Sequence, residues 1–174
     1  MHDAIVIGAG PAGLLAARRL ALRGLDVVVL EEHASIGDPV HCTGILAREA
    51  FSEFGLSSAS VLNELTTARF ISPAGHDIVY RTRVVEAVVV DRAAFDTCLA
   101  SDATQAGARL VRDARVTGVS READGVSVSV KGQPQRRARS CVLHRETRVP
   151  ASDEQPVTSY QLPVTSNHLP VTSC

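Results

Sequence analysis

Cys42 stands with a histidine, a threonine and two turn-forming residues in the short segment 38–44, which reads DPVHCTG. A cysteine in this setting could ligate a metal, act as a nucleophile, serve as a redox thiol or line a ligand site. The other cysteines, at positions 98, 141 and 174, are widely spaced, and no pair has the C-x-x-C spacing of a zinc or redox centre. We therefore expect neither a metal site nor a disulfide framework, which favours a reducing, cytoplasmic environment.

A second group of residues that could do chemistry is the glycine-rich segment VIGAGPAG, in which Gly8, Gly10 and Gly13 have the G-x-G-x-x-G spacing. The apolar patterns around it predict a strand, a helix and a second strand over residues 4–7, 11–23 and 26–30. In such a βαβ unit the first glycine permits a tight turn, the second lets the backbone approach a pyrophosphate, and the third lets the helix pack on the strand. The helix N-terminus adds free N–H groups and the positive end of its dipole.

Glu31 follows the second predicted strand, where dinucleotide-binding proteins carry an acidic residue. A carboxylate there can accept hydrogen bonds from ribose hydroxyls and would repel a 2′-phosphate. The motif therefore predicts FAD or NAD in preference to NADP, and it does not decide between the first two. The alternative is that the glycines only form a tight turn in a protein that binds no nucleotide. Glu32 and His33, which come next, are expected to be solvated loop residues.

The remaining pattern predicts further α/β elements and then a tail. It predicts a helix over residues 44–55, two strands joined by a turn at 73–75, a strand at 86–92, a helix over about 91–105 and three short strands within 108–132. The chain ends in QPVTSYQ, LPVTSNH and LPVTSC, a seven-residue repeat whose prolines exclude a coiled coil. We expect one domain over residues 1–132 and a low-complexity, disordered tail over residues 133–174.

Composition excludes several classes of function. The net charge of −1 leaves no electrostatic footprint for nucleic acid, and an aromatic content of 3% without tryptophan argues against a base-stacking platform. The first apolar run, residues 4–17, is interrupted by glycine and proline and is too short to span a bilayer. The N-terminal MHDAIVIGAG also lacks the basic region and cleavage site of a signal peptide.

Two long segments carry a resemblance to a known family. VIGAGPAGLLAARRLALRGLDVVVLEEHASIGDPVHCTGIL, followed by VVVDRAAFDTCLASDATQAGARL, resembles the N-terminal part of the geranylgeranyl reductase family. Those are FAD-dependent enzymes of the superfamily that includes the para-hydroxybenzoate hydroxylase-like monooxygenases. The more discriminating part is Gly37-x-Pro39-x-x-Cys42-x-Gly44. Together with the patterns above, the resemblance implies a partial Rossmann-like FAD-binding domain, with a βαβ unit and a small β-meander, followed by the disordered C-terminal tail that the composition predicts.

The resemblance also assigns residues to the cofactor. The residues implied to contact FAD are Gly8, Gly10, Ala12, Gly13, Glu31, Cys42, Thr43, Gly44, Arg92 and Val116. Ala12 and Glu31 belong to the Rossmann core, and Val116 would contribute backbone contacts near the adenine. No catalytic residue and no oligomeric state follow from the resemblance.

The residues 42–44 would line the flavin end of the cofactor. Small residues there let backbone N–H groups approach a flat ring, and the compact, polarisable thiol of Cys42 can rest against it. Arg92 offers a permanent positive charge to the pyrophosphate. Each assignment has a plainer alternative, because Cys42 could be a small buried residue and Arg92 could pair with Asp91 or Asp96.

The family reaction saturates prenyl C=C bonds in lipid, chlorophyll or quinone precursors. The resemblance therefore implies an FAD-dependent oxidoreductase that acts on a prenylated small molecule, with peripheral membrane contact in the full-length relatives. A flavin monooxygenase of the same superfamily is one alternative, and a catalytically inactive remnant or bare dinucleotide-binding module is another. The family's second glycine–aspartate segment and its substrate-binding half find no match in this sequence, so we expect a truncated chain.

Overall fold

The computed structural model describes residues 1–143, which divide into two compact units. The first unit contains residues 1–36 and 99–143, and the second contains residues 37–98. Helix α3 (Arg92–Gln105) begins in the second unit and ends in the first.

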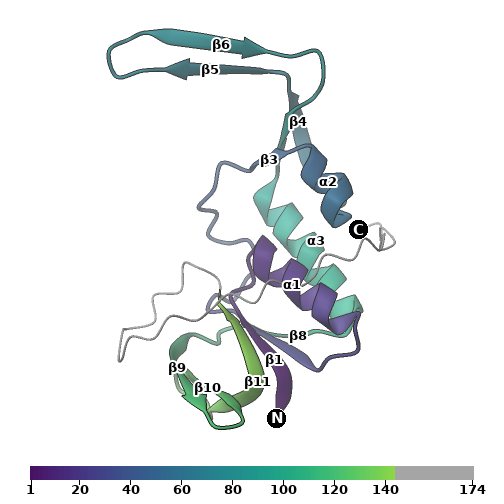
Figure 1. Cartoon of the computed structure of the whole chain (residues 1–174), viewed down its shortest axis with the longest axis vertical. Helices are drawn as coiled ribbons and strands as arrows, with labels where there is room; N and C mark the ends of the chain where they lie inside the picture. Colours follow the sequence, from purple (N-terminus) through teal and green to yellow (C-terminus); the bar gives the residue numbers. More distant parts are fainter. Residues whose placement is uncertain (144–174) are drawn as a thin grey trace. The chain divides into compact units, whose positions relative to one another are not determined.

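A six-stranded sheet forms the first unit, with the strand order β8-β2-β1-β11-β10-β9 (Figure 1). Its strands are β1 (His2–Ile7), β2 (Val27–Leu30), β8 (Arg109–Val111), β9 (Val116–Glu122), β10 (Gly125–Val130) and β11 (Arg136–Leu143). The first four strands of that order are parallel to one another, whereas β11, β10 and β9 are joined by antiparallel pairing. The sheet is thus a parallel Rossmann-like core extended by a β-meander, which confirms the predicted α/β class.

The β1–α1–β2 unit follows from strong local patterns. Residues 4–7 and 27–30 are at most 3% exposed, as expected of parallel strands covered on both faces. Helix α1 (Pro11–Ala21) has a proline at its start and two arginines in its last turn, and both features suit those ends of a helix. The core around these strands contains Ile5, Ile7, Val28, Leu30, Ala114, Val128, Val130 and Ala138.

Strand β11 corrects the predicted domain boundary. The sequence predicts a disordered tail from residue 133 onward, yet residues 136–143 pair in parallel with β1 and antiparallel with β10. Ala138 is only 1% exposed in this strand. The prediction is therefore wrong for residues 136–143, because this arginine-rich segment becomes a strand by pairing with the preceding β10 and with β1, which is distant in sequence. The rest of the predicted tail, including the repeats, lies outside the described residues.

The second unit contains two small antiparallel sheets, β3-β7-β4 and β5-β6. Its strands are β3 (Ile45–Ala47), β4 (Val61–Leu65), β5 (Thr67–Ile71), β6 (Asp77–Arg81) and β7 (Ala87–Val90). The predicted β5–β6 hairpin, strand β7 and helix α3 are confirmed. The predicted helix over residues 44–55 is too long, since its first residues pair with β7 as β3 and leave α2 (Glu49–Phe54) as one short helix. The pattern also misses β4, a strand of mostly exposed residues.

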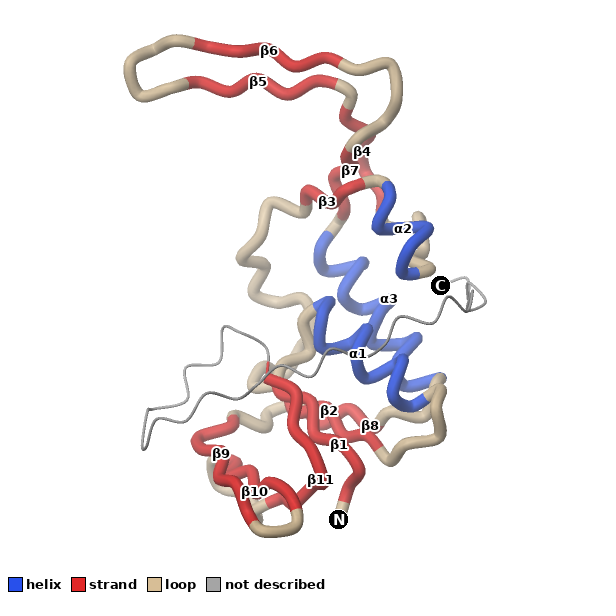
Figure 2. Tube along the Cα trace, viewed as in Figure 1, coloured by secondary structure: helices blue, strands red, loops and turns tan. Residues whose placement is uncertain are grey.

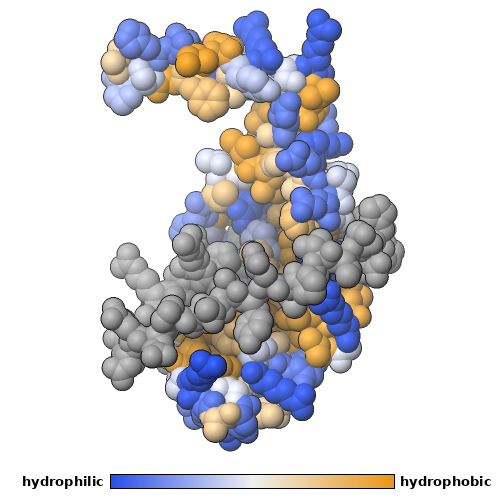
Figure 3. Space-filling view, viewed as in Figure 1, coloured by the Kyte–Doolittle hydropathy of each residue, from blue (hydrophilic) through white to orange (hydrophobic). Residues whose placement is uncertain are grey.

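The β5–β6 hairpin is amphipathic and stands apart as a ribbon of its own in Figure 2. Phe70 pairs with Ile78 and Ala68 with Tyr80, so these four side chains share one face. Phe70, Ile78 and Tyr80 are 63%, 72% and 53% exposed, and Figure 3 shows hydrophobic side chains gathered on the hairpin. The other face carries the Arg69–Asp77 ion pair, with 2.8 Å between Nε and Oδ2, beside the exposed side chains of Ile71 and Val79.

No helix within residues 1–143 is both long and apolar enough to cross a membrane. Within the same part of the chain, no cluster of three or more His, Cys, Asp or Glu side chains could hold a metal ion.

Candidate cofactor-binding site

The glycine motif forms a tight turn between β1 and α1. Gly8 has a φ of +94°, a conformation that L side chains rarely adopt, and its N–H donates to Leu30 O over 2.8 Å. A Cβ atom at Gly13 would lie 2.2 Å from Gly8 O. The third glycine is therefore required by the contact between helix and turn, as the spacing predicts.

The N-terminus of α1 offers an anion-binding surface. Its N-cap residue, Gly10, has no side chain that could cap the helix, and the first turn contains no acidic residue. Ala12 lies exposed in that first turn. The N–H groups and the positive end of the helix dipole are thus left for an external anion, and a pyrophosphate fits this cradle.

Glu31 lies beside this turn, at the end of β2. Its Oε2 accepts a hydrogen bond of 2.7 Å from Ala9 N, and its Oε1 accepts one of 3.0 Å from His33 N. The ring Nδ1 of His33 lies 2.7 Å from the same Oε1. Burial would raise the pKa of Glu31, but the hydrogen bonds from Ala9 and His33 outweigh burial and lower the pKa below its ordinary value.

The Cys42 segment packs closely against the start of α3. Gly37 has a φ of +74°, and a Cβ atom there would lie 2.9 Å from Ala93 Cα. Gly44 has a φ of +75°, and a Cβ atom there would lie 2.5 Å from Val90 O. The two glycines of the G-x-P-x-x-C-x-G segment are therefore the points at which the loop touches β7 and α3.

Arg92 connects this loop to α3. Its Nε and Nη2 donate to Oδ1 and Oδ2 of Asp96 over 3.1 and 2.9 Å, so the predicted alternative of an Arg92–Asp96 pair is confirmed. A guanidinium has further donors, and the positive charge of Arg92 is near enough to the Cys42 thiol to lower the pKa of that thiol. The ion pair with Asp96 therefore leaves Arg92 able to contact another group.

Cys42 is exposed, so the alternative of a small buried residue is wrong. A hydrogen bond from the Gly44 backbone lowers the pKa of Cys42, burial opposes this weakly, and the positive charge of Arg92 lowers it further. Thr43 beside it is exposed as well.

The predicted site residues thus form two groups. Gly8, Gly10, Ala12, Gly13 and Glu31 meet at the carboxyl ends of β1 and β2 in the first unit. Val116 begins β9, the last strand in the order of the sheet, and packs against the hydrophobic core. Cys42, Thr43, Gly44 and Arg92 meet in the second unit.

His33 is the functional candidate that sequence reasoning missed. The sequence predicts a solvated loop residue, but both its main chain and its ring contact Glu31. The spacing Glu-x-His was available as a signal, since a side chain two residues beyond an acceptor can turn back onto it.

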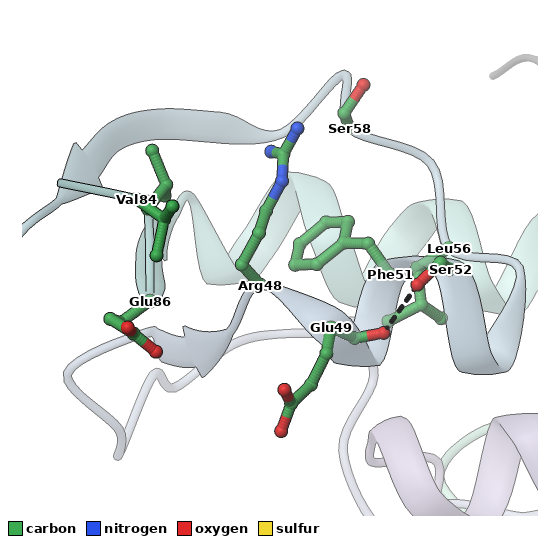
Figure 4. A pocket seen from close by; sticks show the side chains of 9 residues that line it. Arg48, Glu49, Phe51, Ser52, Leu56, Ser58, Val84 and Glu86 are labelled. Atoms are coloured by element: carbon green, nitrogen blue, oxygen red, sulfur yellow. Dashed lines mark hydrogen bonds between the residues drawn. The ribbon is translucent and has the colours of Figure 1, made fainter. Parts of the chain in front are cut away.

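An open cavity of about 500 Å³ lies elsewhere in the second unit (Figure 4). It is lined by Arg48, Glu49, Phe51, Ser52, Leu56, Ser58, Val84, Val85 and Glu86. Arg48 lies 3.2 Å from Glu64 in an ion pair. None of the predicted cofactor residues lines this cavity.

The family model described as "FAD binding domain" matches residues 1–141. The chain belongs to this family. FAD is therefore the cofactor, which settles the choice that the glycine motif left open. The uncapped helix end, the Gly8–Gly13 contact and the Glu31 carboxylate fit the pyrophosphate and ribose of such a cofactor.

The resemblance to geranylgeranyl reductases is confirmed by curated relatives. The chain is 33% identical over 135 residues to digeranylgeranylglycerophospholipid reductase 1 of Methanothermobacter thermautotrophicus, covering 74% of this chain and 34% of that one. It is 37% identical over 134 residues to digeranylgeranylglycerophospholipid reductase of Methanothrix thermoacetophila, covering 75% and 33%. The chain thus spans about a third of the length of these relatives.

Solved structures agree on the fold. A geranylgeranyl bacteriochlorophyll reductase-like protein from Thermoplasma acidophilum superimposes with a TM-score of 0.72 at 27% identity, over 82% of this chain and 38% of the other. The halogenase PltM in complex with phloroglucinol and FAD gives a TM-score of 0.66 at 20% identity, over 86% and 35%. The second likeness concerns the fold alone.

Proposed function

We propose that this chain is the FAD-binding part of an oxidoreductase of the geranylgeranyl reductase type, which saturates C=C bonds in the prenyl chain of a lipid, chlorophyll or quinone precursor. The main support is the 33% and 37% identity to digeranylgeranylglycerophospholipid reductases over about three quarters of the chain. A prenylated lipid is the substrate class, and peripheral contact with a membrane would follow from such a substrate.

The residues divide the work of holding the cofactor. Reduced FAD supplies the hydride that saturation of a C=C bond needs. The turn from Gly8 to Gly13 and the N-terminus of α1 bind the pyrophosphate, and Glu31 accepts a hydrogen bond from the adenosine ribose. By the family resemblance, residues 42–44 would line the flavin end of the cofactor, and Arg92 would offer its positive charge to a phosphate. The support for this last role is the family resemblance, since the guanidinium of Arg92 already pairs with Asp96.

The test has two stages. The purified chain is first titrated with FAD while its visible spectrum and its gel-filtration volume are recorded. The flavin is then reduced anaerobically and mixed with a digeranylgeranyl lipid, and its reoxidation is followed at the flavin absorbance maximum. Stoichiometric flavin and reoxidation by the lipid with saturation of its chains would support the proposal. A matched sample with a fully saturated lipid is the control.

Two other outcomes would redirect the assignment. Stoichiometric flavin that no prenylated lipid reoxidises would make the chain an FAD-binding module without turnover. Reoxidation by oxygen with hydroxylation of an aromatic substrate would favour the monooxygenase alternative. A colourless protein that gains no flavin would overturn the proposal.

A further inference from the structure

We infer that His33 is a positioning residue, which holds the Glu31 carboxylate so that one acceptor site on Oε2 is presented to a ribose hydroxyl of the bound nucleotide. His33 would act on the ribose only through Glu31, so this inference rests on the proposed role of Glu31 in binding FAD.

The main chain fixes where Glu31 stands. Its N–H donates to Val111 O over 2.9 Å, and its carbonyl accepts from Ala114 N over 2.8 Å. The residue is therefore paired on its backbone with the chain at the end of β8. Only the side-chain torsions remain to be set, and the contacts to Ala9 and His33 set them from opposite ends of the carboxylate.

The number of hydrogen-bond acceptor sites on the Glu31 carboxylate decides what its orientation leaves available to a ligand. An ionised carboxylate only accepts hydrogen bonds and has about four lone-pair sites on its two oxygens. Because the carboxylate cannot donate, the His33 Nδ1 at 2.7 Å from Oε1 must carry the hydrogen. The two contacts from His33 then fill the sites on Oε1, and Ala9 N fills one of the sites on Oε2. One site on Oε2 is left, on the same oxygen that touches the glycine turn.

The main chain of His33 is fixed by a hydrogen bond from the segment after β8. Its carbonyl accepts a hydrogen bond of 3.3 Å from Asp113 N, and Asp113 has the left-handed φ of +53°. The His33 side chain is 45% exposed. A half-exposed imidazole is not needed to fill a core, so its contact with a buried carboxylate points to a role in orienting that carboxylate.

Two substitutions at His33 test whether the hydrogen bond from Nδ1, rather than the imidazole ring itself, is what positions Glu31. His33→Ala removes the Nδ1 donor and keeps the main-chain N–H, whereas His33→Asn places an amide N–H at a similar distance from its own backbone. His76→Ala is the matched control, because His76 is an exposed histidine in the turn of the β5–β6 hairpin. Thermal unfolding of all variants reports on any loss of structure.

The measurement is a pair of dissociation constants. Competition against FAD, followed by flavin fluorescence, gives the dissociation constants of adenosine monophosphate and of 2′,3′-dideoxyadenosine monophosphate. The dissociation constant of the dideoxy nucleotide divided by that of adenosine monophosphate measures how much the ribose hydroxyls contribute to binding. We expect His33→Ala to lower this ratio by about tenfold, His33→Asn to restore most of it and His76→Ala to leave it unchanged. A purely structural role would weaken both nucleotides equally and leave the ratio unchanged.

A Glu31→Ala variant, which removes every side-chain acceptor, tests the role of Glu31 separately from that of His33. If Glu31→Ala leaves the ratio unchanged, the proposed ribose role of Glu31 is wrong and the role of His33 fails with it. If Glu31→Ala lowers the ratio but His33→Ala does not, Glu31 binds the ribose without help from His33, and the inference about His33 alone is overturned. A wild-type chain that binds neither nucleotide overturns both.

Discussion

The backbone N–H of Ala9 donates to Oε2 of Glu31 across 2.7 Å, so the turn after β1 is tied to the end of β2. The bond joins the two parts of the proposed nucleotide site through a residue that is only 9% exposed. A buried carboxylate that accepts hydrogen bonds is also a source of folding stability, because the unfolded chain lacks these bonds.

The lowered pKa of Glu31 predicts how stability depends on pH. Its contribution is fully present above the unfolded pKa, near the ordinary 4.5, and is lost as the pH falls through the lower folded pKa. We expect Glu31→Gln to lower the free energy of unfolding at pH 7 by about 1–3 kcal/mol, and the difference from wild type to shrink as the pH falls below 4.5. Urea unfolding across this range measures it, with Glu32→Gln as the exposed control. A difference that stays constant with pH would contradict the assignment.

Replacing Gly13 by alanine should produce a steric clash that outweighs the higher helix propensity of alanine. Alanine is intrinsically the better helix former by about 1 kcal/mol, yet a Cβ at Gly13 would lie 2.2 Å from Gly8 O. We expect Gly13→Ala to lower the unfolding temperature and to weaken FAD binding by at least about tenfold, because the turn must open. Gly118→Ala is the control, since its Cβ would come no closer than 3.9 Å to Ser129. Equal behaviour of the two variants would show that the turn tolerates the methyl group.

The sequence could predict β1, α1 and β2 because each depends on local pattern. The buried runs, the proline at the helix start and the glycine spacing are all contained within residues 4–31. Strand β11 could not be predicted in this way. Its arginines resemble a polar tail, but Arg139 lies 3.3 Å from Asp3, which is distant in sequence, and Arg137 pairs with Glu122 of the same β-meander.

The residues of the candidate site likewise divide into those that local sequence predicts and those that it does not. Spacing alone places Gly13 and Glu31, whereas the contact of His33 with Glu31 needs the turn of the chain after β2. The close approach of Gly44 to Val90 likewise arises only when β3 pairs with β7.

Gly44 and Gly75 offer a comparison of strain with and without a clash. Both have left-handed φ values, +75° and +82°, but a Cβ at Gly44 would lie 2.5 Å from Val90 O. Among the described residues, nothing lies within 4 Å of a Cβ at Gly75. We expect Gly75→Ala to cost about 1–2 kcal/mol from its backbone conformation and Gly44→Ala to cost more. Chemical denaturation measures both, and equal costs would show that the Cys42 loop moves freely away from β7.

Cys42 and Cys141 should differ sharply in reactivity. The Gly44 backbone and Arg92 lower the pKa of Cys42, whereas burial raises the pKa of Cys141 to about 11. Because the thiolate is the nucleophile, we expect iodoacetamide at pH 7.5 to alkylate Cys42 at least about a hundredfold faster, as two pKa units imply. Peptide mass spectrometry follows both sites.

Arg92 tests the cause of the Cys42 reactivity. Arg92→Gln should slow alkylation of Cys42 at pH 7.5 and move its pH profile upward, while Arg92→Lys, which keeps the charge, should slow it less. The rate at Cys141 serves as the internal reference. An unchanged Cys42 rate in Arg92→Gln would mean that the Gly44 N–H alone lowers the pKa.

The exposed apolar face of the β5–β6 hairpin should limit the solubility of the chain. Phe70 and Ile78 pair across the strands and are 63% and 72% exposed on the face that carries no charge, and exposed apolar strands associate readily. We expect Phe70→Thr combined with Ile78→Thr to raise the concentration at which light scattering begins by several-fold. Val79→Thr on the opposite face is the control and should change it little. If the double variant precipitates earlier than wild type, the apolar face is instead needed to keep the hairpin folded.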